Sequence, residues 1–169
     1  MKTTLQKDIV ETFEKLNTTV SLFSDGELNT IPYQGSWTPG QVTQHIIMAS
    51  SGYPELFAGK TEKTTRKPDE KIKDIDALFL NFSIKMNAPD FLQPEKKEHS
   101  KNALNLKLLK IESELLDSAE KCDLTLTCLD FQVPGFEKFT IYEWIDFVLV
   151  HTQRHTKQLN DIFRHVTKL

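Results

Sequence analysis

The sequence lacks the features of disulfide-stapled, membrane-spanning and nucleic-acid-binding proteins. Its 169 residues contain two cysteines, Cys122 and Cys128, whose spacing fits neither a disulfide scaffold nor a CxxC redox or zinc motif. The longest fully apolar runs have four residues, far fewer than the ~20 that span a bilayer. Lys and Arg number 21 against 24 Asp and Glu, so there is no basic excess to neutralise a phosphate backbone. We therefore expect reduced thiols, no membrane span and no nucleic-acid partner.

The sequence motifs of several enzyme classes are missing as well. The chain has no HExxH, GxSxG, P-loop or GxGxxG motif, and no glutamate stands three residues before a histidine as in di-iron helical bundles. The N-terminal residues MKTTLQKDIVETFEKL include acidic side chains and no apolar stretch, so we expect no export signal and a cytoplasmic location. Any site must therefore combine residues that are distant in sequence.

Apolar residues recur at intervals of three and four in four segments, which is the period of an amphipathic helix. We expect long helices over residues 2–23, 38–53, 100–121 and 140–169. The second should end near Tyr53, because Pro54 follows and the residue before a proline disfavours the helical conformation.

Two of these helices have strong start signals. Thr38 with Gln41, and Thr140 with Glu143, have the spacing of a capping box, in which the two residues satisfy each other's free backbone N–H groups. Pro39 suits a first helical position, where no N–H donor is needed. These signals fix the starts of the second and last helices.

The segments between the long helices are less regular. Residues 59–74 are rich in Lys, Glu and Thr and predict a solvated crossover loop, and residues 72–82 predict a shorter helix. A short extended piece is expected within 122–139. No repeat or linker divides the chain. We predict one all-α domain over residues 1–169, a four-helix bundle with a long crossover connection between helices 2 and 3.

Three of the five histidines fall on the apolar faces of predicted helices. His45 lies in the stripe of the second helix, and His151 and His155 lie in that of the last. A pair at i and i+4 places two imidazoles one turn apart on the same face, from where both can reach one zinc-like ion. His99 and His165 lie in a loop and near a helix end, and we do not expect them to be ligands.

Two interpretations of the inward histidines remain open. Such a histidine is often a core residue bonded to one polar neighbour, and for His45 taken alone that is the simpler reading. Three together would repel one another if charged and would each need a partner if neutral, whereas one divalent cation satisfies all three. Three imidazoles with an open position are the ligand set of a catalytic metal site.

Two polar residues lie beside the histidine pair on the helical wheel. Gln158 could orient a ligand or touch a substrate, or be a buried amide bonded to the backbone. Arg154 could hold an anionic group, or extend its charge to the surface. We keep both as possible helpers of the site, and the sequence shows no convincing general base.

These residues carry a resemblance to a known family. The segments SWTPGQVTQHI and FTIYEWIDFVLVHTQRHTKQL resemble the two signature blocks of the DinB/YfiT-like superfamily. The resemblance implies a four-helix bundle and a divalent metal, often zinc or nickel, held by three histidines. His45, His151 and His155 match that pattern position by position.

The resemblance also implies a range of functions. Some relatives are transferases or isomerases that use a low-molecular-weight thiol, and others are assigned as metal-dependent hydrolases. We therefore predict a metal-dependent enzyme that activates water or a thiol for a small-molecule substrate, as a hydrolase or thiol S-transferase. The alternative is a non-catalytic bundle that binds a metal or a small ligand. Members are often homodimers, and Leu149 and Val150, expected on the outer face of the last helix, suit a partner surface or a covering loop.

Overall fold

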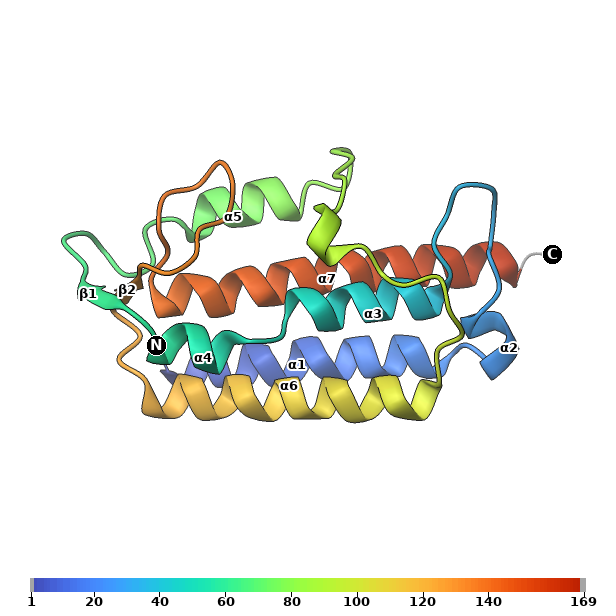
Figure 1. The fold of residues 1–169 in the computed structure, drawn as a ribbon, viewed down its shortest axis with the longest axis horizontal. Coiled ribbons are helices and arrows are strands. Elements are labelled where there is room, and N and C mark those ends of the chain that lie inside the picture. Colours follow the sequence, from blue (N-terminus) through green and yellow to red (C-terminus); the bar gives the residue numbers. More distant parts are fainter. Residues whose placement is uncertain (1, 168–169) are drawn as a thin grey trace.

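The computed structural model describes residues 2–167 and is all-α apart from one small sheet (Figure 1). Its helices are α1 (Lys2–Ser21), α2 (Asp25–Leu28), α3 (Pro39–Ala49), α4 (Tyr53–Ala58), α5 (Ile72–Phe79), the 3-10 helix η1 (Asp90–Leu92), α6 (Lys101–Lys121) and α7 (Ile141–Val166). Strands β1 (Thr61–Lys63) and β2 (Leu126–Cys128) form an antiparallel pair. The predicted fold class is confirmed.

Four helices, α1, α3, α6 and α7, form the bundle (Figure 1). Helix α1 packs against α6 and α7, and α3 packs against the same two helices. The inner face of α1 has the expected spacing and is almost fully buried, with Leu5, Ile9, Phe13, Leu16 and Val20 in the core. Among residues 2–167, no helix combines the length and the apolar content that a membrane span requires.

The predicted start signals of the second and last long helices are confirmed. The Gln41 N–H donates to Thr38 Oγ1 at 3.1 Å, and the Thr38 N–H donates to Gln41 Oε1 at 3.0 Å. The same reciprocal pair joins Thr140 and Glu143 at the start of α7. Each cap stabilises the first turn of its helix, and the helical period then places the histidines on the apolar face.

The predicted end of the second helix is wrong. Helix α3 ends at Ala49, and Tyr53 begins a new helix, α4. Gly52 lies between them with a φ of 84°, a left-handed conformation that glycine adopts without steric cost. Pro54 then occupies the first turn of α4, where its missing N–H costs nothing. The proline therefore begins a helix here.

The long crossover between the second and third bundle helices is confirmed, but its charged part is not simply solvated. Strand β1 pairs with β2, with Thr61 opposite Cys128. Helix α5 lies along α7, and η1 lies near α3 (Figure 1). The side chain of Arg66 reaches the buried carboxylate of Glu143. Composition could not reveal this anchor, because the partner is 77 positions away.

Of the two alternatives predicted for Leu149 and Val150, a partner surface is wrong, because other parts of the chain cover both side chains. Their side chains are 3% and 4% exposed. Helix α7 is contacted by α1, α3 and α5, so neighbours cover more of its circumference than a simple four-helix packing predicts. These two residues belong to the core and offer no partner surface.

Candidate metal centre

The structure brings together the three histidines that the sequence singled out. Helix α3 carries His45, and α7 carries His151 and His155. Their ring centroids are 5.1 Å apart for His45 and His151, 4.7 Å for His45 and His155, and 4.5 Å for the pair on α7. Each ring offers one nitrogen to a group whose members all lie within 4.8 Å of one another. Such a group could hold a metal ion.

Hydrogen bonds to the outer ring nitrogens orient two of the imidazoles. His45 Nδ1 lies 2.8 Å from the Leu92 carbonyl oxygen, and His155 Nδ1 lies 2.8 Å from Gln158 Oε1. Both partners are acceptors, so Nδ1 carries the proton and donates in each case. The lone pair is therefore on Nε2, as in histidines that bind a metal through Nε2.

The spacing and chemistry of the donors fit a divalent ion. His45 Nε2 and His151 Nε2 are 3.3 Å apart. Two nitrogens bound at about 2.0–2.1 Å to one tetrahedral ion lie about 3.3–3.4 Å from each other. Imidazole suits zinc, nickel, copper and iron. His151 Nδ1 is buried and has no hydrogen-bond partner within residues 2–167.

Burial keeps the three imidazoles neutral. It lowers the pKa of His45 against the opposing effect of the Leu92 carbonyl. It lowers the pKa of His151 well below its ordinary value, and a proton there would also be repelled by nearby Arg154 and by either neighbouring histidine if that were protonated. The pKa of His155 falls to about 4, mainly through burial. Near neutral pH the cluster therefore presents unprotonated nitrogens, which metal binding requires.

Aromatic side chains enclose the cluster. The Trp37 ring is 5.2 Å from that of His45. The Phe147 ring stacks on His151 with centroids 5.9 Å apart, and Phe79 meets the same imidazole edge-on at 6.3 Å. These rings restrict rotation of the imidazoles. They also shield the imidazoles from water, and this burial lowers the pKa values of the histidines.

The side chain of Arg154 hydrogen-bonds to the crossover segment and is therefore not free to bind an anionic group beside the cluster. Its guanidinium donates to the carbonyl oxygens of Phe79 at 2.9 Å and Asn81 at 3.1 Å, and also to that of Ile84. This ties the segment after α5 to the part of α7 that carries the histidines. Gln158 hydrogen-bonds to His155, in agreement with one of the roles that the sequence left open for it, the orientation of a ligand.

The Leu92 carbonyl is a part of the site that sequence reasoning missed. It comes from η1, within the crossover, 47 positions from His45. A backbone carbonyl leaves no mark in the residue pattern, so no sequence signal could have identified it. Phe147 was also missed, although its place one helical turn before His151 could have indicated the contact.

The histidines also line a cavity of about 1740 Å³. Its walls come from α3, α4, α6 and α7, from the crossover near η1, and from residues 131–136. This volume exceeds the roughly 300–1,000 Å³ of a typical small-molecule site. A small compound therefore has room beside the three imidazoles.

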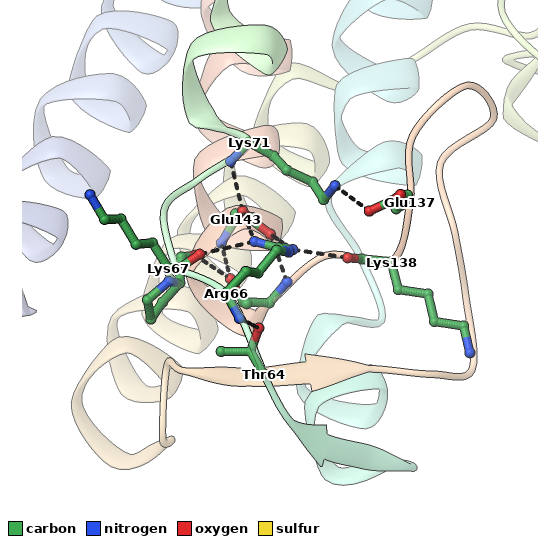
Figure 2. A network of polar contacts seen from close by, with 9 residues as sticks. Thr64, Arg66, Lys67, Lys71, Glu137, Lys138 and Glu143 are labelled. Atoms are coloured by element: carbon green, nitrogen blue, oxygen red, sulfur yellow. Dashed lines mark hydrogen bonds and ion pairs between the residues drawn. The ribbon is translucent and has the colours of Figure 1, made fainter.

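A second buried polar cluster lies near the start of α7. Figure 2 shows the Glu143 carboxylate receiving both terminal nitrogens of Arg66 at 2.6 Å and the Lys71 backbone N–H at 2.9 Å. The Thr140 N–H adds a donor at 2.9 Å, and the Lys71 ammonium pairs with Glu137 at 2.8 Å. The hydrogen bonds to Glu143 raise the pKa of Arg66. We call this set the Glu143 network.

Comparison with known proteins places the chain in a family. The model of the DinB superfamily matches residues 8–159, which include all three histidines. The chain is similar to the uncharacterized protein YuaE of Bacillus subtilis (strain 168), with 27% identity over 147 residues that cover 82% of this chain and 85% of that protein. No solved structure matches. Because the family model spans most of the bundle and both helices that carry the histidine cluster, the chain belongs to the DinB superfamily.

Proposed function

We propose that the protein is a metal-dependent enzyme in which His45, His151 and His155 bind one divalent ion, zinc or nickel. The reaction is attack on a small-molecule substrate by water or a low-molecular-weight thiol. The observation that carries this proposal is the meeting of three neutral imidazoles, two of which have Nδ1 engaged by acceptors. Membership of the DinB superfamily supports it.

The protein's part in this chemistry is binding and orientation. A divalent ion supplies Lewis acidity, which makes water or a thiol nucleophilic near neutral pH. The Leu92 carbonyl and Gln158 hold two rings in place, and Phe147 keeps water from one face of the third. Because these groups are fixed before any ligand arrives, little reorganisation accompanies binding.

A thiol transferase agrees better with the site than a hydrolase. A divalent ion can make water nucleophilic, but hydrolysis generally also uses a positioned acid or base to move protons to and from the reacting groups. Among the described residues that line the cavity, the two carboxylates are Glu55, which is exposed to solvent, and Glu114, which pairs with Lys110, so neither is held as a base beside the imidazoles. A thiol is acidic enough to ionise next to a cation without a separate base. We therefore place thiol S-transfer before hydrolysis.

A non-catalytic bundle is the second candidate, and the 3.3 Å distance between His45 and His151 favours it equally. If His151 carries its proton on Nε2, that group donates to His45 Nε2 and joins the two helices without an ion. A metal could also serve only to tie α3 to α7. The homodimer and the cytoplasmic location stay predictions.

Metal content and turnover separate these candidates. Untagged wild type should bind about one zinc or nickel ion per chain, and so should His165→Ala, since His165 packs against Tyr33 outside the cluster. His155→Ala should bind far less. Metal-loaded wild type is then tested with a panel of thiols and electrophiles. Turnover equal to that of His155→Ala would exclude metal-dependent catalysis, and absence of metal in wild type would favour the bundle held by hydrogen bonds.

A further inference from the structure

Many of the chain's aromatic side chains line the cavity beside the histidines. Five of the chain's 11 phenylalanines, both tryptophans and two of the three tyrosines line it, together with Met48 and Met86. Aromatic rings and thioethers contact planar ligands through offset or edge-on stacking and sulfur–ring contacts. The chain has thus concentrated its aromatic side chains around one space.

The aromatic wall is continuous with the histidine cluster. The Phe131 and Trp144 rings are 5.9 Å apart, Trp144 and Phe147 are 5.7 Å apart, and Phe147 stacks on His151 at 5.9 Å. Three of these four residues follow one face of α7, so the wall leads along the helix to a proposed metal ligand. A planar group bound there lies next to the reacting centre.

The charged groups at the cavity surface are either paired or solvated. The Arg154 guanidinium donates to three backbone carbonyls, and Lys110 pairs with Glu114 at 3.5 Å. The remaining charged residues of the wall are exposed to solvent, namely Glu55, Lys85 and Lys107. An anionic substituent held against the aromatic wall, away from the histidines, would lose its hydration and would meet no buried free cationic side chain among the described residues of the wall, which is unfavourable.

We propose that the substrate carries an uncharged aromatic group, which binds against Phe131 and Phe147, in front of the buried Trp144, while its reactive atom faces the three histidines. This rests on the proposed function, because the histidines supply the reacting centre. The cavity volume leaves room for a second reactant, such as the thiol, beside the aromatic group.

A matched pair of fluorescent probes tests the class of ligand. N-phenyl-1-naphthylamine is neutral, and 8-anilinonaphthalene-1-sulfonate has the same ring system with a negative charge. Zinc-loaded protein is titrated with each probe, and quenching of Trp37 and Trp144, both in the cavity wall, reports binding there. The neutral probe should bind at least tenfold more tightly. Equal affinities, or tighter binding of the sulfonate, would overturn the proposal.

A matched pair of variants locates the binding site. Phe131 is 48% exposed and lines the cavity, whereas Phe82 is 49% exposed and is not among the lining residues. Phe131→Ala should weaken binding of the neutral probe about tenfold, and Phe82→Ala should leave it unchanged. Because both rings are half exposed, neither change threatens the fold. Equal effects of the two variants would overturn the proposal.

Replacing zinc by cobalt tests proximity to the histidines and separates the two proposals. Paramagnetic cobalt should speed the nuclear relaxation of the bound probe's ring protons, and diamagnetic zinc should not. Bound probe that is insensitive to cobalt would overturn the substrate assignment. If neither metal binds but the neutral probe still binds selectively and Phe131→Ala weakens it, the metal proposal fails, and the aromatic specificity of the cavity is supported.

Discussion

Helix α7 takes part in two buried polar sites, and they satisfy their polar groups in opposite ways. At the Glu143 network, the buried carboxylate receives donors from Arg66, Lys71 and Thr140, all from the same chain. At the histidine cluster, two outer ring nitrogens have partners, but the inner nitrogens of His45 and His151 face each other. One site is complete within the chain, and the other needs a proton or a cation between its members.

This difference separates a closed structural contact from a group of side chains that could hold a cation. A buried charge with matched partners fastens two segments, here the crossover and the start of α7 (Figure 2). Nitrogen lone pairs that point at one another, with no hydrogen-bond donor between them, are stabilised by a bound cation. Asp146, between the two sites on α7, is a third case. Its Oδ2 is buried without a partner in the part of the chain that the structure describes.

The largest expected effect comes from breaking the Glu143 network. Arg66→Met leaves the Glu143 side chain, 0% exposed, with backbone donors but no counter-ion. Removing one partner of a buried pair costs about 3–5 kcal/mol of the free energy of unfolding. We expect a loss of this size in urea denaturation of the metal-free protein.

Lys71→Met is the control for that variant. It removes the pair with Glu137, whose side chain is 84% exposed, and should cost less than about 1 kcal/mol because solvent screens the interaction. It leaves the Lys71 backbone N–H on Glu143 intact. Equal losses in the two variants would show that the network does not depend on the buried pair. Zinc affinity should be unchanged in Lys71→Met, since the histidines are at the other site.

The next effect should appear at the histidine cluster. His151→Ala removes one proposed ligand, and the affinity for zinc should fall by more than about a hundredfold. Loss of a residue that only hydrogen-bonds to a metal ligand already costs about 10–100-fold. Competition with a chromophoric chelator measures this. His99→Ala is the control, since His99 is buried like His151 but lies outside the cluster. If His99→Ala lowered the affinity for zinc as much as His151→Ala does, the histidine cluster would not be the zinc site.

The sequence predicted the parts of the molecule that depend on local pattern. The apolar period gave the long helices, and the boxes at Thr38 and Thr140 fixed the starts of α3 and α7. Because the helical period places all three histidines in apolar stripes, their meeting could also be predicted. Local rules are reliable where one residue constrains its neighbours within a turn.

The parts that escaped prediction depend on partners that are distant in the chain. Arg66 stands in a charged run that resembles a solvated loop, and nothing near it indicates Glu143. The Leu92 carbonyl is contributed by the backbone. Leu149 was misplaced because its burial depends on how the neighbouring helices pack around α7. These features require the tertiary structure.

The unpartnered oxygen of Asp146 should make stability depend on pH. Burial, helped by the charges of Asp76, Asp8 and Glu143, raises its pKa from 3.8 to about 7. The folded protein therefore keeps this proton between about pH 4 and 7 while the unfolded chain releases it, so the free energy of unfolding falls as the pH rises through that range. A change in pKa of this size corresponds to at most about 4 kcal/mol.

Asp146→Asn should remove that contribution to the pH dependence. Solvent at this partly exposed side chain reduces the expected effect to about 2 kcal/mol. The unfolding free energy of the variant, relative to wild type, should thus rise by about 2 kcal/mol between pH 4 and pH 8 in metal-free urea titrations. Parallel pH profiles for the two proteins would contradict this. Such a result would mean that Asp146 is satisfied in the folded state as fully as Glu143 is.

The smallest effect sharpens the comparison within the histidine cluster itself. Gln158 Oε1 fixes the Nδ1 proton of His155, so Gln158→Leu should free the ring to rotate and lower zinc affinity about tenfold, or about 1.4 kcal/mol. Gln158→Glu keeps an acceptor at the same place and should retain the affinity. Gln153→Leu, the same change at an exposed position of α7, should have no effect. If Gln158→Leu binds zinc as tightly as wild type, packing against the other two imidazoles is enough to orient His155. The hydrogen bonds to Nδ1 of His45 and His155 would then not be needed to hold the imidazoles in position for a metal ion.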